Sequence, residues 1–363
     1  MNVIFRYITS GFWKNFASLL LILFLVLTSN ELAHWLSDVA SGELAIDYVF
    51  KILLYSTPEL LGTLLPIASF LGVIFSVGRL WADSEMIVLW ASGYTWVKLV
   101  RDLLISAIIV SLIVGFISIW LLPRANLLRE QTISQGEANS VMNITVPGRF
   151  QAIDGGKLVF YVEDKDDEFL KDIFIAQMPE GSNDEQWRVI VAKKAKINYS
   201  FEKNGLLLTL LDGSRYVGTP GNTDYTEIYF SEYRQLYQPE DATIVQHNRV
   251  KLSGDLLKSD SIGENMEFEM RLAKPISVIV LLFIALALSK LDPRKGRFVK
   301  LFPAIIIYVA YFNLITVSSR SVASGKWPVW LGPWWVHMVF LLAGLIWLAK
   351  ESGMLYSLSR RRS

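Results

Sequence analysis

The side chains that most often perform enzyme chemistry are few in this chain and lie far apart. Cysteine is absent, which excludes disulfides, iron–sulfur clusters and thiolate zinc sites. The nearest approach to a phosphate-binding loop, Gly155-Gly156-Lys157, has Gln151 in place of the first glycine and Leu158 in place of the hydroxyl residue. Neither H-E-x-x-H nor G-x-S-x-G occurs, and the three histidines are scattered, at His34, His247 and His337. We therefore expect no catalytic residue, no metal ligands and no cofactor in this chain.

A short segment with acidic residues at its start is the first candidate for binding chemistry. Ser84 can cap a helix, and Asp83 and Glu85 favour the positive end of the helix dipole. Apolar or small residues then recur at helical spacing, at Met86, Leu89, Trp90 and Gly93. This pattern predicts a short amphipathic helix near residues 82–95. A membrane-surface helix without a partner usually carries Lys and Arg, so the acids favour a protein partner with basic or polar groups.

The elements that position this segment are long apolar stretches, three before and three after a polar island. Each stretch is close to the roughly 20 residues that cross a bilayer core of about 30 Å. Hydrophobic residues make up 52% of the chain and charged ones 19%, which is too apolar for a soluble protein. Glu59 after Thr57-Pro58 is expected to charge the start of the second helix. The expected spans are Phe16–Leu36, Leu60–Leu80, Val97–Leu122, Leu272–Leu288, Leu301–Val317 and Trp330–Ala349.

Lysine and arginine in the short loops predict the orientation. Loops on one side hold most of them, including Arg79 and Arg361, whereas the opposite short loops hold only Lys51, Arg320 and Lys326. By the positive-inside rule both termini are cytoplasmic and the island faces outward, which in a Gram-negative cell means the periplasm. A signal peptide is a weaker interpretation of the first span, because its apolar run is long and no small-residue cleavage pattern follows. The net charge of +1 points to no particular partner, and we expect no nucleic acid.

The outward island has the pattern of an antiparallel β domain. Short runs rich in β-branched and aromatic residues alternate with turn signals such as Asp154-Gly155 and Asp212-Gly213. A sandwich or jelly roll is predicted, either as a rigid spacer or as a platform for another strand-rich domain or an apolar ligand. The expected strands are Lys157–Glu163, Asp172–Gln177, Trp187–Ala192, Leu206–Leu211 and Tyr225–Phe230. The expected domains are helices in 1–122, the β domain in 123–270, and helices with a cytoplasmic C-terminus in 271–363.

Several of these motifs together resemble the LptF/LptG permeases, the membrane subunits of the lipopolysaccharide export ABC transporter. The resemblance covers the whole chain, and its signature consists of Thr57-Pro58-Glu59, Pro66, Gly78-Arg79-Leu80, Ser84-Glu85 and Ala91-Ser92-Gly93. Three further stretches resemble the LptF type of subunit more than the LptG type: Gly148–Gln151, Asp172–Gln177 and Leu291–Arg297.

This resemblance implies six transmembrane helices, a periplasmic β-jelly roll and an LptF–LptG heterodimer in the inner membrane. Two copies of the ATPase LptB would bind ATP and Mg²⁺. Lipopolysaccharide would enter the cavity between the two permeases from the outer leaflet and pass to LptC, whose transmembrane helix joins the complex. The helix near 82–95 would be the coupling helix, with Glu85 in the groove of the ATPase and with contacts from Asp83, Ser84, Glu85, Leu89 and Gly93.

The resemblance also implies basic substrate contacts, because lipid A carries phosphates just outside the membrane. Arginine binds phosphate with two hydrogen bonds, and lysine reaches the headgroup from a helix end. Each such residue could instead simply anchor a helix end at the interface. Glu31 lies on the same helix face as His34 and could hold that imidazole protonated. The predicted phosphate contacts are His34, Arg271, Lys274, Arg320 and Lys326.

Three alternatives remain beside an LptF-type permease. The first is the LptG subunit of the same transporter. The second is a membrane scaffold or sensor that transports nothing. The third is a secondary transporter, which is the weakest because the spans carry few charges near their centres.

Overall fold

The computed structural model describes residues 3–40, 44, 46–144, 148–153, 158–166, 169–179, 186–200, 205–219, 221, 224–237, 248–290 and 300–352. The chain divides into two compact units. The first, of residues 1–30, 55–127 and 244–363, is helical, and the second, of residues 31–54 and 128–243, carries the β-sheet. The predicted turn at Asp154-Gly155, the motif Leu291–Arg297 and the cation Arg361 lie outside the described residues.

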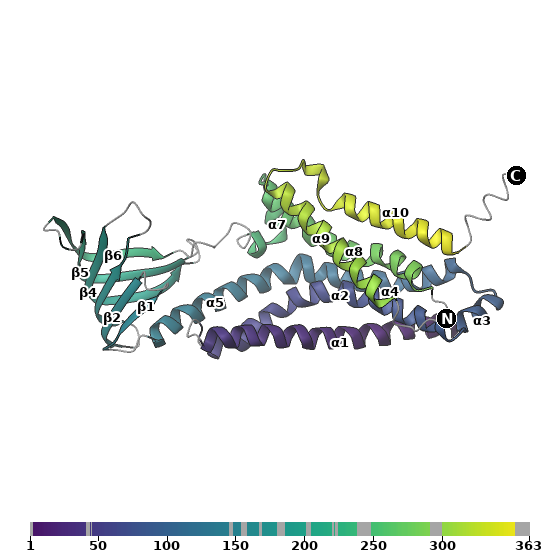
Figure 1. The fold of residues 1–363 in the computed structure, drawn as a ribbon, viewed down its shortest axis with the longest axis horizontal. Helices are drawn as coiled ribbons and strands as arrows, with labels where there is room; N and C mark the ends of the chain where they lie inside the picture. Colours follow the sequence, from purple (N-terminus) through teal and green to yellow (C-terminus); the bar gives the residue numbers. More distant parts are fainter. Residues whose placement is uncertain are drawn as a thin grey trace. The chain divides into compact units, whose positions relative to one another are not determined.

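Among the described residues, six helical segments are long and apolar enough to cross a membrane, as the sequence predicted. The third continues from α4 through the π-helix η2 into α5 (Figure 1). Most helices are longer than the predicted spans, because an apolar run marks only the part of a helix that lies in lipid. The long helices are α1 (Val3–Ala40), α2 (Val49–Ala82), α4 (Trp96–Phe116) with η2 (Ile117–Leu121) and α5 (Leu122–Ile144), α8 (Ile262–Leu288), α9 (Leu301–Ala323) and α10 (Trp334–Glu351). The short ones are η1 (Ile46–Tyr48), α3 (Glu85–Ala91), α7 (Ser253–Leu256) and η4 (Val329–Leu331).

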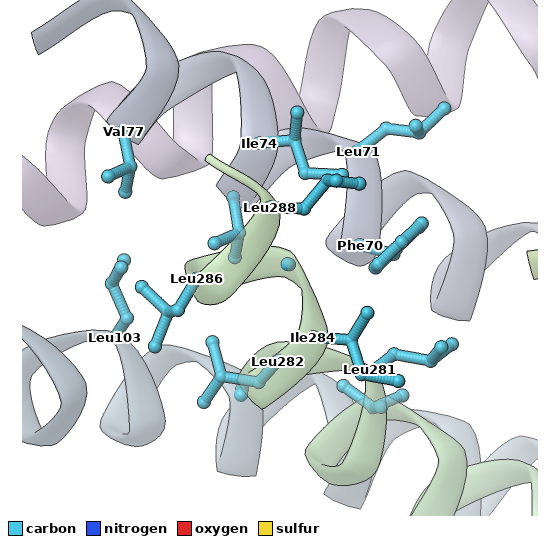
Figure 2. Packing of buried hydrophobic residues seen from close by; sticks show 14 of the residues in the cluster. Phe70, Leu71, Ile74, Val77, Leu103, Leu281, Leu282, Ile284, Leu286 and Leu288 are labelled. Carbon is cyan, nitrogen blue, oxygen red and sulfur yellow. The ribbon is translucent and has the colours of Figure 1, made fainter. Parts of the chain in front are cut away.

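Helix α8 lies at the centre of the helical unit, because its second half is apolar around most of its circumference. Figure 2 shows Leu281 and Leu286 of α8 in one cluster with Phe70 of α2 and Leu103 of α4. Ser111 of α4 adds a hydrogen bond, donating to the carbonyl of Pro275 in α8 at 2.8 Å. In a membrane, close packing and such interhelical bonds hold helices together, since lipid tails are as apolar as leucine.

Helix α1 is buried chiefly near its start. Phe12 and Phe16 belong to the core, and a Cβ added at Gly72 of α2 would lie 3.3 Å from the Cα of Phe16, so the two backbones approach closely. Further along α1, apolar residues such as Leu21 and Leu25 are more than half exposed. An apolar helix face of this kind has to be covered by lipid or by another protein.

Among the described residues, the second unit contains six strands in one antiparallel sheet. Its strands are β1 (Phe150–Ile153), β2 (Leu158–Lys165), β3 (Leu170–Gln177), β4 (Trp187–Ser200), β5 (Gly205–Gly218) and β6 (Tyr225–Tyr237). The five predicted runs coincide with β2 to β6, and β1 was missed. The order is sequential, so the described strands form an antiparallel meander, in which each strand pairs with its neighbour in sequence. The predicted inserted antiparallel β domain is thus confirmed. Buried side chains on the sheet include Val162, Ile173, Ile190 and Leu210.

The predicted turn at Asp212-Gly213 is wrong, because both residues lie inside β5. Asp212 has a φ of 52° and is passed over in the register, in which Leu211 and Gly213 pair with residues of β4. A Cβ added at Gly213 would lie 2.2 Å from the carbonyl oxygen of Val191, so only glycine fits there. The pair therefore lies within one long strand, whose register with β4 and β6 is the same on both sides of it.

Candidate functional site

The connection between α2 and α4 carries the predicted coupling residues, and α3 begins there at Glu85. The prediction that the Ser84 side chain caps this helix is wrong. Within the described part of the chain its side chain makes no capping hydrogen bond, and its backbone is left-handed with a φ of 58°. Backbone hydrogen bonds hold the turn instead, from the Ser84 N–H to the Trp81 carbonyl at 3.1 Å and from the Asp83 N–H to the Arg79 carbonyl at 2.9 Å. The left-handed residue lets α3 follow α2 after two residues.

Glu85 belongs to a charged network that joins three helices. Its Oε2 accepts a 2.6 Å hydrogen bond from the Tyr7 hydroxyl of α1, and this hydroxyl accepts one of 3.0 Å from Arg79 Nη2 of α2. Arg79 also lies 3.7 Å from Glu85 Oε1 and 3.9 Å from Asp83 Oδ2. Tyr7 was missed by sequence reasoning, because it is distant in the chain and belongs to no motif. The network fixes the carboxylate of Glu85 at the start of α3.

The outer face of α3 is apolar. Met86 is fully buried and Leu89 is half-buried, whereas Ile87 and Val88 are 55% and 70% exposed. Gly93 is also exposed and takes a φ of 83°, which suits glycine at the end of a helix. Of the predicted contact residues, Leu89 is thus partly covered by the chain itself. The exposed ridge of Ile87 and Val88, next to the acidic start of the helix, is the surface that a partner can cover.

Arg271 of α8 is the largest fully buried side chain, at 1% exposure. A guanidinium has five N–H donors, and each of the five in Arg271 donates to an oxygen atom of the chain. Nε donates to the carboxylate of Glu267 at 3.2 Å. The other acceptors lie in the chain that leads into α8: the carbonyls of Lys251, Asn248 and Arg249 at 3.0, 3.2 and 3.0 Å and the hydroxyl of Ser253 at 2.9 Å. Arg271 therefore clamps residues 248–253 onto α8.

Ser253 connects the Arg271 side chain to the third span. Its hydroxyl accepts from Arg271 and donates to the carbonyl of Ile119 at 2.6 Å. Ile119 lies in η2, where the wider π-helical turn interrupts the regular α-helical ladder. A buried chain of two hydrogen bonds thus connects α8, the segment that begins α7, and the π-turn of the third span. Sequence reasoning gave no signal for this connection.

Lys274 lies one turn after Arg271 and faces α2. A Cβ added at Gly62 of α2 would lie 3.8 Å from Lys274 Nζ. Among the described residues no hydrogen bond and no ion pair within 4 Å is made by this ammonium group. Glu59 lies ten residues inside α2, so it does not start that helix as predicted, and its Oε1 is 3.7 Å from Arg249 Nη1. Lys274 is a cation available to an anionic ligand.

Arg320 lies in the last turn of α9, Lys326 lies in the loop that follows, and both side chains are exposed. In the part of the chain that the structure describes, neither side chain has a carboxylate within ion-pair distance. The backbone N–H of Lys326 donates to the Ser321 carbonyl at 2.9 Å, which ties the loop after α9 to the helix. Both cations are therefore free to contact an anion outside the chain.

His34, in the sheet-containing unit, is 67% exposed, and its Nε2 lies 3.9 Å from Asp38 Oδ2. The predicted contact between Glu31 and His34 is not observed. The carboxylate of Glu31 instead accepts a hydrogen bond of 3.2 Å from the Trp35 indole. The expectation that Glu31 holds His34 protonated is thus replaced by a one-turn pair of His34 with Asp38. Trp35 packs against a small core of Leu44, Val49 and Ile52.

The described residues contain no group of three or more His, Asp or Glu side chains that could hold a metal ion. The features that stand out are an exposed helix with an acidic start, a buried arginine clamp, and cations that form no salt bridge within 4 Å among the described residues. Such an arrangement can bind, position and transmit.

Comparison with known proteins gives a consistent result. The sequence profile of a family described as lipopolysaccharide export system permease LptF/LptG matches residues 6–350. The lipopolysaccharide export system permease protein LptF of Escherichia coli K12 is 24% identical over 346 residues, which cover 95% of this chain and 94% of that protein. The LptF proteins of Escherichia coli O157:H7 and Shigella flexneri match with the same identity and coverage.

Proposed function

This chain belongs to the LptF/LptG family of lipopolysaccharide export permeases, and from this premise we propose that it is the LptF-type subunit of the transporter. In that role it extracts lipopolysaccharide from the outer leaflet of the inner membrane and passes it to the periplasmic bridge toward the outer membrane. The match over residues 6–350 carries the proposal, because it includes α3 with its acidic start. The relatives named above, which are LptF proteins, support the choice of subunit.

The energy comes from a partner, since the sequence has no phosphate-binding loop. We propose that two copies of an LptB-type ATPase bind ATP and Mg²⁺ and that one of them docks on α3. Glu85 offers a carboxylate whose position is fixed by Tyr7 and Arg79, and Ile87 and Val88 offer an apolar ridge. A basic group of the ATPase would meet the acid and an apolar groove would cover the ridge.

In the same proposal both termini are cytoplasmic and the β domain is periplasmic. The exposed apolar faces of α1 and α9 would meet lipid or an LptG-type partner, and the LptC protein with its transmembrane helix would complete the assembly. The distribution of lysine and arginine in the short loops supports this orientation.

In the same proposal, the phosphates of lipid A are met by cations that form no salt bridge within 4 Å among the described residues. Lys274, Arg320 and Lys326 fit this role, and His34 is a weaker candidate because Asp38 lies beside it. Arg271, which was predicted with them, has all its donors engaged, so we assign it to positioning the chain around Lys274.

Co-purification tests the proposal. The tagged full-length protein, extracted from its own membrane, should bring down an LptB-type ATPase and an LptG-type permease. Rescue of cells depleted of LptF, but not of cells depleted of LptG, would support the choice of subunit. Isolation without any ATPase would contradict the permease function, and rescue of the LptG-depleted cells alone would reverse the subunit.

A further inference from the structure

One surface of the third span carries a row of large side chains that no feature described so far uses. Its members recur every four residues, so they are neighbours on one helix face, and all of them belong to the helical unit. Leu112 and Phe116 are more than half exposed, Trp120 is 48% exposed, and Arg124 is exposed as well. These four residues are called the third-span ridge. An exposed row of this kind has to face lipid or another protein.

The ridge runs from the apolar core of the bilayer into the headgroup region. Residues 103–123 contain no charged side chain. At about 1.5 Å per residue they cover about 32 Å, which matches a bilayer core of about 30 Å. Arg124 therefore lies at the level of the lipid headgroups, and Trp120 lies in the interfacial zone that tryptophan prefers. Phe116 and Leu112 lie at the depth of the acyl chains. In the orientation proposed above, this is the outer leaflet.

The guanidinium of Arg124 is held in place by the ridge itself. Its carbon Cζ lies 4.3 Å from the centre of the Trp120 ring, and Nη1 donates to the Trp120 carbonyl at 2.8 Å. The rings of Trp120 and Phe116 stack, with centres 5.2 Å apart and planes inclined by 20°. A side chain that is already ordered loses little conformational freedom when a ligand binds. An arginine that merely extends from a helix end to the interface needs neither contact.

The π-turn η2 makes the Trp120 carbonyl available for this bond. The turn interrupts the regular α-helical ladder, so its carbonyls are open to other donors. The Ile119 carbonyl accepts from the buried hydroxyl of Ser253 at 2.6 Å. The next carbonyl, of Trp120, accepts from the exposed side chain of Arg124. The wide turn is thus bonded to the protein interior on one side and to the ridge on the other.

Most donors of Arg124 remain available for a ligand. A guanidinium has five N–H groups, and one of them bonds to the Trp120 carbonyl. Within the described ranges the others make no hydrogen bond, and no carboxylate lies within 4 Å of the group. The planar fork of a guanidinium matches two oxygens of a phosphate. The ridge therefore presents a phosphate-binding end followed by an aromatic and apolar surface, which is the order of groups in a phospholipid.

We propose that the third-span ridge binds one anionic glycerophospholipid. Arg124 binds its phosphodiester, and the rings of Trp120 and Phe116 pack against an acyl chain. Phosphatidylglycerol suits this site better than phosphatidylethanolamine, because the ethanolamine cation would lie beside the guanidinium. Lipid A suits it less, since several phosphates and acyl chains need a broader basic surface than one arginine on one helix face. Binding at the ridge does not depend on the transport function proposed above.

Photocrosslinking compares the lipid at the ridge with the lipid at another apolar surface. Benzoylphenylalanine is placed at Phe116 and, in a separate protein, at Leu342, an exposed position of α10. The full-length protein, with the partners that co-purify with it, is reconstituted in nanodiscs of phosphatidylglycerol, phosphatidylethanolamine and lipopolysaccharide. Mass spectrometry identifies the adducts. We expect phosphatidylglycerol to be enriched about ten-fold among the adducts at Phe116, the scale of one charge-assisted contact.

Three results of this experiment would overturn the proposal. The same lipid composition at both positions would make the ridge part of an unselective lipid layer. Lipopolysaccharide as the main adduct at Phe116 would assign the ridge to the substrate path. A protein adduct in place of a lipid adduct would make the ridge a protein interface.

Arg124→Gln measures the contribution of the cation. The side chain is exposed, so the change does not disturb the core. Titration with phosphatidylglycerol, followed by native mass spectrometry, should show about ten-fold weaker binding than in the wild type. Lys258→Gln removes the same charge from an exposed site outside the ridge and should bind as the wild type does. Equal affinity in the two variants would reject Arg124 as the phosphate ligand.

Discussion

The hydroxyl of Tyr7, in the first helix of the chain, donates a 2.6 Å hydrogen bond to Glu85, the first residue of α3. Because the same hydroxyl accepts from Arg79, a single phenol joins α1, α2 and α3. A displacement of α3 by a docked ATPase would therefore act on α1, the helix whose apolar face is largely exposed. This gives the family signature Gly78-Arg79-Leu80 a physical role: Arg79 holds the phenol and the carboxylate together.

Tyr7→Phe should weaken the coupling between ATP hydrolysis and transport. The change removes only the hydroxyl, and because the network is partly exposed we expect a loss of about two- to five-fold in lipopolysaccharide released per ATP hydrolysed. Reconstituted vesicles with radiolabelled ATP measure this ratio. Tyr55→Phe is the matched control, since the Tyr55 hydroxyl has no hydrogen-bond partner in the described ranges. An unchanged ratio in Tyr7→Phe would show that the phenol does not transmit motion.

Arg271→Lys should destabilise the helical unit although the charge is kept. Lysine has three donors in place of five and cannot reach the same acceptors, so we expect a loss of about 2–4 kcal/mol. A lower thermal midpoint in detergent and faster proteolysis within residues 248–253 would report it. Arg320→Lys, at an exposed site, should stay within about 0.5 kcal/mol of the wild type. A stable Arg271→Lys protein with impaired lipid binding would instead restore the phosphate-contact prediction.

Lys274→Met should weaken lipopolysaccharide binding without lowering the stability of the protein. Methionine has a similar length and needs no counter-charge, so the protein should be as stable as the wild type or slightly more stable. Crosslinking of lipopolysaccharide to neighbouring positions of α2 should fall about ten-fold, the loss expected for one charge-assisted contact. Gly62→Ala is the control, because its added methyl group would lie 3.8 Å from Lys274 Nζ, an ordinary contact. Unchanged crosslinking in Lys274→Met would remove Lys274 from the substrate site.

Gly213→Ala should disrupt the sheet locally. The added methyl group would lie 2.2 Å from the Val191 carbonyl and 2.6 Å from the Phe230 ring, so the strands must separate at a cost of about 3 kcal/mol or more. Faster amide hydrogen exchange in β4, β5 and β6 is the expected observation. Gly254→Ala, where nothing lies within 4 Å, should leave exchange unchanged. Equal exchange in the two variants would mean that the strands are not tightly packed at Gly213.

The membrane helices and most strands could be predicted because their signals are local. A bilayer requires apolar runs of a fixed length, and a half-buried strand such as β3 requires alternation over neighbouring residues. The strand β1 was missed because Phe150–Ile153 is too short to show a period. Asp212-Gly213 has the composition of a turn, and only its pairing with the adjacent backbone of β4 reveals that it lies inside a strand.

The functional site was predicted less well, because its contacts are not local. The sequence marked Glu85 and the cations near the helix ends, but the partners of Glu85 come from α1 and α2. Arg271 at the edge of an apolar run looks like a ligand for phosphate, and its true acceptors lie about twenty residues earlier in the chain. Such pairings depend on the tertiary fold, which amino-acid composition and spacing do not encode directly.

The π-turn η2 takes up one extra residue in the third span. A π-turn contains one residue more than an α-helical turn, and each residue turns a helix by about 100° and advances it by about 1.5 Å. Removing one residue from Ile117–Leu121 would let the span heal into a regular helix. The residues on either side would keep nearly the same helical phase, because a π-turn takes up its extra residue by widening. The extra residue thus widens one turn of the third span, and this widened turn carries the Ile119 carbonyl that accepts from Ser253.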